Sequence, residues 1–487
     1  MDFTDTLIRA RIPFLLNYYD INNTFLDMYP ALDTRRAEAT KSPSPPLLSE
    51  LPNIPPEVAE CYLDEDNLYE DGLDYCPFMW FDNIELGNHE TTHRAPVGLT
   101  NHQAHENFAQ RSQEVLQELT PFANCSSSRL HLENAIGQDL FSAENMSAFA
   151  HLYVQHSHRH CPILHLPTFQ AQHATVPLLL AIFLGGSLHS YPRDTYYLAV
   201  DCFDIAEAYL FSLPVFKPGY KNLAPSELHM SERHEALKAA VILLHLQIGR
   251  NDPEIRQRVR YQRFPMLVQA ARSASLFSSR HHDNSPLAGA RTSDYQKESL
   301  IRTAAYILLL DSQFVVCLRS PPMITILELT GDLPCNEVMF SHSYSSSLAN
   351  TPRSPSLVEI IDLLMDGAWD GPSNPSFNNI GVFGLFIVIS GLHLVIFSAF
   401  ASRTMQQLLP PLHRALSRWK LLWERLMSRI SIEEVELAGF MTCANEVWLI
   451  AKVLLRTDSQ EFFSGFDSQS LQPFNYLLRR VSEVSDQ

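Results

Sequence analysis

From about His105 onward, apolar residues recur at the spacing of one helix face in a series of segments that clusters of Pro, Ser and Asn separate. Leu116, Leu119 and Phe122 begin the series, and the stretch 300–318 is apolar nearly all round, which is typical of a buried helix. Glycine contributes only 17 of 487 residues. Because glycine-rich nucleotide-binding folds and barrels need far more, the sequence predicts an all-α domain over residues 105–487.

The first hundred residues have a different composition. Residues 35–56 include SPSPPLLSELPNIPP, whose prolines remove backbone donors and disfavour helix at each preceding position. The stretch 42–93 holds 12 Asp and Glu residues and no Lys or Arg. We therefore expect residues 35–104 to be a disordered Pro-rich and acidic-aromatic region, and residues 1–34 to be a short N-terminal helical segment that could dock on the core.

The segment Glu57 to Glu90 interleaves aromatic side chains with carboxylates. Repulsion between the carboxylates keeps the aromatics apart and available to the groove of a coactivator, with Phe78, Trp80 and Phe81 supplying apolar area. A solvated acidic linker whose aromatics pack back on the domain is the alternative. The composition alone leaves both interpretations open.

The net charge of -18 opposes binding to nucleic acid, since an acidic surface repels phosphate. The only dense basic stretch contains Arg256, Arg258, Arg260 and Arg263. Three of these arginines share a helical face and could contact phosphate or an acidic partner, but a solvated helix face is the preferred interpretation. We expect no direct, sequence-specific DNA binding by this chain alone.

Metal sites, catalytic motifs and membrane spans give no clear signal. The eight cysteines are scattered without a Cys-x-x-Cys pair, and His156, His158 and His160 alternate around a helix, so neither set predicts zinc. Nucleophile elbows, phosphate-binding loops and His-Glu-x-x-His motifs are absent, so we expect no enzyme.

Residues 380–400 are apolar and long enough to span a bilayer, but we expect a core helix and no membrane partner. The start of the sequence, MDFTDTL, lacks the positive residues of a secretory signal.

The run Leu152 to Phe169, LYVQHSHRHCPILHLPTF, resembles the opening of the fungal-specific transcription factor domain, the middle homology region. In that family a helix carrying Tyr and His breaks at a Pro, and an extended segment leads to the next helix. The resemblance implies structural roles, including burial of Phe169, for the matching residues Tyr153, His156, His158, Pro162, Ile163, Leu164, His165, Pro167, Thr168 and Phe169.

The resemblance continues in the family's order from Leu116 to Ser402. AARSASLF and ESLIRTAAYILLLDSQFVVCLRSPPMI match the family's Arg-containing helix end and its Asp-bearing helix before a Pro-Pro turn. LPCNEVMF is a variant familiar in members that carry two classical zinc fingers. Further structural positions implied by this match are Asp311, Pro321, Pro322, Leu333 and Pro334.

The resemblance implies a nuclear transcription regulator of RNA polymerase II genes, an activator acting on metabolism or on a cluster for secondary metabolite biosynthesis. Its helical regulatory domain would sense a metabolite or a partner, and its partners would be coactivators and a DNA-binding transcription factor or a second copy. The family's fingers are absent from this sequence, so no cofactor is expected here, and zinc only in a finger module encoded upstream. The alternative is a finger-less interaction protein that modulates a complete factor.

Overall fold

The computed structural model describes Leu15 and residues 101–190, 193–219, 227–250, 252–282, 293–341, 354–458, 462–463 and 471–481. Within these ranges every regular element is helical, which confirms the all-α class. Apart from Leu15, residues 1–34 and 35–104 lie outside this description almost entirely, and Phe78, Trp80 and Phe81 lie outside it too.

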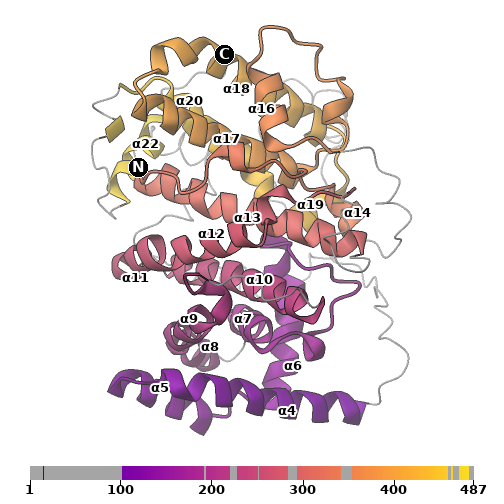
Figure 1. Ribbon diagram of the computed structural model, residues 1–487, viewed down its shortest axis with the longest axis vertical. Coiled ribbons are helices and arrows are strands. Elements are labelled where there is room, and N and C mark those ends of the chain that lie inside the picture. Colours follow the sequence, from indigo (N-terminus) through magenta and orange to yellow (C-terminus); the bar gives the residue numbers. More distant parts are fainter. Residues whose placement is uncertain are drawn as a thin grey trace, which may run out of the picture.

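The helices are stacked in layers along the long axis of the molecule (Figure 1). Helices α4 and α5 form one end, α6 to α10 lie beside them, and α11 to α13 cross the middle. Their bounds are α4 Asn101–Leu119, α5 Ser126–Gly137, α6 Ala143–Leu152, α7 Val176–Ser187, α8 Arg193–Asp201, α9 Phe203–Ser212, α10 Glu227–Gly249, α11 Pro253–Arg258, α12 Phe264–Ser273 and α13 Asp294–Leu318.

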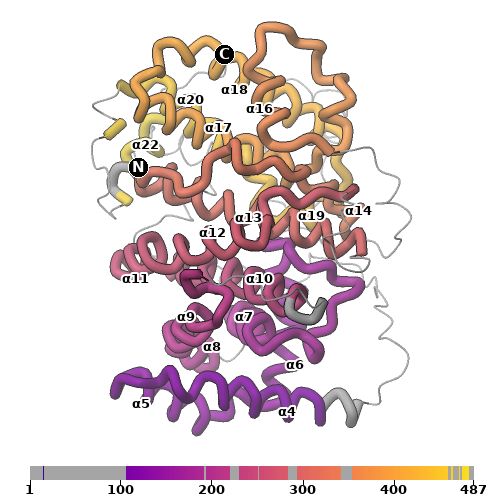
Figure 2. Tube along the Cα trace, in the orientation of Figure 1, coloured from indigo at the N-terminus to yellow at the C-terminus, as the bar shows by residue number. Residues whose placement is uncertain are grey.

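The C-terminal helices form the other end of the stack. Figure 2 shows α13 running between them and the N-terminal layers, and α13 packs on both α10 and α17. The bounds of the remaining helices are α14 Glu337–Ser341, α16 Leu357–Met365, α17 Val382–Ala401, α18 Met405–Met427, α19 Ile432–Ala438, α20 Ala444–Leu454 and α22 Gln472–Arg480.

Capping residues in the sequence explain where several helices begin. Ser293, Ser356 and Ser431 each accept a hydrogen bond from the backbone three residues later, where a Gln or Glu side chain bonds back to the serine N–H. These reciprocal bonds satisfy backbone donors that a helix start leaves unpaired. They fix the starts of α13, α16 and α19.

The most apolar helix is α17, which the sequence predicts as a core helix. Within the part of the chain that the structure describes, three helical stretches are long and apolar enough to cross a bilayer by length and composition: Asp294–Leu318, Val382–Ala401 and Ile432–Leu454. In each of them most of the apolar window is buried, to 89% in Val382–Ala401. Packing against α13, α16, α18 and α20 therefore accounts for the hydrophobicity of α17.

The amphipathic stretch 432–455 does not form one continuous helix. Gly439 adopts a φ of 54°, and the 3-10 turn η14 (Gly439–Cys443) separates α19 from α20. A Cβ at Gly439 would lie 2.6 Å from the carbonyl oxygen of Arg159. The absence of a Cβ at Gly439 thus allows this turn to pass close to the backbone of Arg159.

A second close approach joins α7 to the end of α6. A Cβ added at Gly186 would lie 1.8 Å from the carbonyl oxygen of Phe149, and one at Gly185 would lie 2.8 Å from the Tyr153 ring. Backbone atoms cannot move aside as a flexible side chain can. The glycine pair therefore sets the distance between the two elements.

We predict that Gly186→Ala destabilises the fold by about 3 kcal/mol, because the methyl group must push two packed backbones apart. Gly137→Ala is the matched control, since a Cβ there meets nothing within 4 Å. Its stability should change by less than about 1 kcal/mol. Urea unfolding of both variants followed by circular dichroism measures the difference, and equal midpoints would refute the close-packing argument.

Candidate functional site

The motif Leu152 to Phe169 runs along α13 and is bonded to it. Ser299 on α13 donates to the carbonyl oxygen of Ile163, and the Tyr306 hydroxyl donates to that of His160 over 3.0 Å. The His165 ring stacks on the Tyr295 ring, with centroids 3.9 Å apart. Side chains on successive turns of α13 therefore hold the extended part of the motif.

Arg302 is the centre of these contacts and has no exposed surface. Its guanidinium donates to Glu298 over 2.6 Å and to the carbonyl oxygen of Cys335 over 2.8 Å, and it reaches the Pro162 oxygen at 3.5 Å. The ring of Phe340 covers its face at 4.3 Å. A buried charge needs this density of partners because leaving it unpaired costs several kcal/mol.

His281 completes the network from outside the motif. Its Nε2 lies 2.6 Å from Glu298, and its Nδ1 lies 3.0 Å from Asp332. Because both ring nitrogens face carboxylates, both must carry protons, and the ring is an imidazolium. Burial opposes that charge, but the bonds to Asp332 and Glu298 outweigh it and raise the pKa of His281 to about 9. Burial likewise opposes ionisation of Glu298, but Arg302 and His281 keep its pKa below the usual range.

Stability should therefore depend on the protonation of His281. A histidine with a raised pKa stabilises the fold fully below its unfolded pKa of about 6.5, and the contribution disappears as the pH rises through about 9. We predict that His281→Gln loses on the order of 2–3 kcal/mol relative to the parent at pH 6, and that the gap narrows toward pH 9.

Unfolding midpoints measured across this pH range test the prediction. The control is His151→Gln, on an exposed position of α6, which should leave only a small difference from the parent. A gap between His281→Gln and the parent that stays constant with pH would show that the ring is neutral in the folded state.

A second buried pair fixes the turn after α13. Asp311 accepts the backbone N–H groups of Met323 and Ile324, each at 2.8 Å. Arg260 lies 3.5 Å from Asp311 and donates to the carbonyl oxygen of Pro321. Burial raises the pKa of Asp311 to about 6, although Arg260 and the two N–H groups oppose the shift. Asp311 is therefore a buried structural residue that holds the Pro-Pro turn in place.

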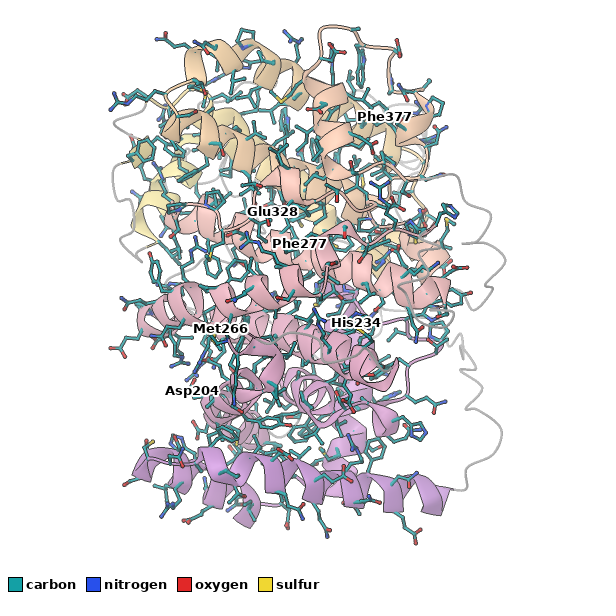
Figure 3. The ribbon with its side chains drawn as sticks, in the orientation of Figure 1. Asp204, His234, Met266, Phe277, Glu328 and Phe377 are labelled. Carbon is teal, nitrogen blue, oxygen red and sulfur yellow. The ribbon has the colours of Figure 1, made fainter. Side chains whose placement is uncertain are left out.

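The prediction of a solvated arginine face over residues 256–263 is wrong. Arg256 and Arg260 are buried, and Arg258 and Arg263 both donate to Glu207 on α9, at 2.9 Å and 2.7 Å. The π-turn η10 (Val259–Arg263) also alters which side chains share a face. Figure 3 labels Asp204, which receives Arg258 at 2.6 Å in the same layer. Arg258, Arg260 and Arg263 bind the protein's own carboxylates.

The end of the motif is less buried than expected. Phe169 is half-buried against the core, and Pro167 and Thr168 are exposed, with the Thr168 hydroxyl 2.8 Å from Nδ1 of His165. Replacing Phe169 by Ala therefore removes less packing than full burial implies. Positions that the structure does bury are Tyr153, His158, Pro162, Ile163, Leu164, His165, Asp311, Leu333 and Pro334, whereas Pro321 is exposed and Pro322 half-buried.

The motif histidines point in different directions. His158 bonds to the carbonyl oxygen of Leu164 at 2.8 Å, His160 accepts the N–H of Phe440 at 3.2 Å, and His156 stacks on His189. Among the residues that the structure describes, no group of three or more His, Cys, Asp or Glu is arranged to hold a metal ion. Each histidine instead joins two segments of the helical core.

A cavity of about 90 Å³ lies beside this network, where α13, α17, α20, α22 and η14 meet. Tyr306, Cys317, Phe386 and Phe440 contribute to a lining that contains no Asp, Glu, Lys or Arg. His245 also lines it, and burial lowers the pKa of that ring to about 4, so it is neutral near pH 7. The cavity is therefore an uncharged, largely apolar compartment.

Leu15 forms part of the cavity wall although it lies far away in the sequence. Its side chain is buried, and its backbone N–H donates to Oε2 of Glu446 on α20 over 2.8 Å. Glu446 is itself only 2% exposed. Leu15 thus contributes to the compartment, and its backbone bonds to a buried carboxylate on α20 that lies outside the lining.

Sequence reasoning missed the charged centre of the site. Glu298 and Arg302 stand four residues apart in a helix that is buried along most of its length, a spacing that places both on one face. Opposite charges four residues apart in a helix that is predicted to be buried could therefore have predicted a buried ion pair. Nothing in the sequence pointed to His281, because its partners come from two separate segments.

Residues 150–421 match the family described as the fungal specific transcription factor domain. The match covers more than half of the 487 residues, so this chain belongs to that family, as its sequence motif predicts. Transcription factor verF of Penicillium polonicum is 26% identical over 358 residues, which are 64% of this chain and 47% of the relative. The chain thus spans about half the length of that relative, and no solved structure matches it.

Proposed function

We propose that this chain is a nuclear regulator of RNA polymerase II transcription that acts on genes of metabolism or of a biosynthetic cluster. The observation that carries the proposal is the family match over residues 150–421, which includes the motif, α13 and α17. The buried ion pairs support a structural role for the motif rather than catalysis. In this proposal the chain is not an enzyme.

The proposed mechanism divides the work between two parts of the chain. The acidic-aromatic segment Glu57 to Glu90 contacts a coactivator through Phe78, Trp80 and Phe81, while its carboxylates keep it soluble and steer the encounter. The helical domain controls that segment in response to a metabolite or a partner. An uncharged cavity beside the motif supports the metabolite as the signal.

We predict that residues 57–90, fused to an unrelated DNA-binding domain, raise transcription of a reporter gene. Replacing Phe78, Trp80 and Phe81 by Ala should abolish the increase, because the apolar contact area is lost while the charge is unchanged. Replacing Thr91, Thr92 and His93 by Ala in a slightly longer fusion is the matched control and should have no effect. Equal output from the aromatic variant and the parent would identify the segment as a linker.

A finger-less interaction protein that modulates a complete transcription factor is the second candidate. One observation favours it: the only dense basic stretch of the chain is bound internally, with Arg258 and Arg263 on Glu207 and Arg260 on Asp311. Those arginines therefore offer little to phosphate. Under this candidate the chain reaches DNA through a finger-bearing factor or through a second copy joined to one.

We predict that the isolated chain selects no sequence motif from random DNA duplexes at about 150 mM salt, because its net charge of -18 repels phosphate. The arginines 258 and 263, which would have to leave Glu207, cannot compensate. Sequencing of the bound pool after successive rounds of selection measures the outcome. A reproducible motif would contradict the prediction and reveal a DNA-binding element in the chain.

A further inference from the structure

Two packed helices at one end of the molecule expose several large apolar side chains. Leu130 and Ile136 of α5 are 64% and 44% exposed, and Tyr197 of α8 is 53% exposed. Helix α8 packs on α5, at the end of the stack that α4 and α5 form (Figure 1). Among the described residues, the other exposed side chains of this kind stand on five separate elements: Tyr261, Leu327, Leu421, Ile432 and Tyr476.

Acidic residues stand beside the apolar ones at helical spacing. On α8, Asp194, Tyr197 and Asp201 are three and four residues apart, so they share one face of the helix. On α5, Glu133 lies three positions from each of the two exposed apolar residues. All three acids are exposed. Each helix therefore presents apolar area and carboxylates together, and we call these two exposed faces the α5/α8 surface.

The carboxylates of Glu133, Asp194 and Asp201 have no partner in the part of the chain that the structure describes. They take part in no hydrogen bond or ion pair there. On the following helix, α9, Glu207 instead binds both Arg258 and Arg263. The charges of the α5/α8 surface are therefore available to another molecule.

The charge around this surface decides which kind of molecule can cover it. Residues 101–212, from α4 to α9, contain ten Asp and Glu residues and four Arg, which gives a net charge of -6. Nucleic acid, an anionic membrane and a second copy of this chain all bring negative charge and are repelled. A polypeptide with Lys and Arg beside apolar residues brings the opposite charge, which steers it to the surface.

We propose that the α5/α8 surface binds a basic amphipathic helix of another protein. Its apolar side chains cover Leu130 and Tyr197, and its cations pair with the three carboxylates. A helix suits the surface because its own residues three and four apart share a face, as those of α5 and α8 do. In the second candidate function a finger-bearing factor carries the chain to DNA. Identifying the occupant as a basic region of that factor rests on this proposed function, whereas binding of the helix does not.

Photo-crosslinking of the full chain locates the binding site. The probe is a helical peptide of Leu and Lys, about 18 residues long, with a benzophenone at its centre. Mass spectrometry of the digested adduct should find the cross-links on α5 and α8. Peptides with Glu in place of Lys, or with Ser in place of Leu, should give few adducts. Cross-links confined to other segments, the acidic stretch 42–93 included, would overturn the proposal.

Fluorescence anisotropy of the labelled Leu and Lys peptide tests the residues. Glu133→Lys combined with Asp194→Lys should weaken binding at least about fivefold, because two attractions become repulsions. Leu130→Ser combined with Tyr197→Ser should weaken it by a similar factor through loss of apolar contact.

Matched changes elsewhere on the surface are the controls. Glu433→Lys combined with Glu436→Lys makes the same change of charge at exposed positions of α19. Leu327→Ser removes a side chain that is 70% exposed in the turn η12 (Ile326–Glu328). Both controls should keep the affinity of the parent within about twofold, since they lie outside the α5/α8 surface.

Either of two results would also contradict the proposal. Unchanged affinity in the α5 and α8 variants would remove the surface, provided that circular dichroism shows their helices intact. An equal loss in the α19 variant would show that the peptide responds to net charge alone. None of these measurements involves transcription or DNA, so their failure is distinct from a failure of the proposed function.

Discussion

Arg302 carries its charge where no solvent reaches it, and much of the surrounding chain is arranged to compensate that charge. Glu298 supplies the carboxylate, the carbonyl oxygens of Pro162 and Cys335 supply further acceptors, and Phe340 and Phe383 cover the guanidinium. These partners come from four separate stretches of sequence. Losing Glu298 or one of the carbonyl acceptors leaves part of a buried charge unpaired, so these stretches depend on one another for their stability.

The motif and the cavity share α13, so they are not independent parts of the molecule. Tyr306 bonds to the motif through the His160 oxygen and also lines the cavity. Phe440 donates its N–H to His160 and lines the same compartment from η14. The family motif, through His160, thus holds two residues of the cavity lining in place, Tyr306 and Phe440.

The sequence predicts the helical class and the burial of α13 and α17 because helical periodicity and apolar runs are local signals. It fails where the deciding partner is distant. Local sequence predicts exposed side chains for Arg258 and Arg263, but both bind Glu207, which lies on another helix. Phe169 is expected to be buried, but the tertiary packing leaves it half-buried. Gly439 gives no local hint that it interrupts a helix, because its role is set by the backbone at Arg159.

The cavity takes its lining from both extremes of the described chain, with Leu15 on one side and Phe474 of α22 on the other. During synthesis the ribosome releases Leu15 first and Phe474 last. A nascent chain therefore has its N-terminal segment, its motif and α13 in solution long before the compartment can close around anything. The cavity is consequently incomplete in every unfinished chain and in every chain clipped before Phe474, whatever the rest of its fold has achieved.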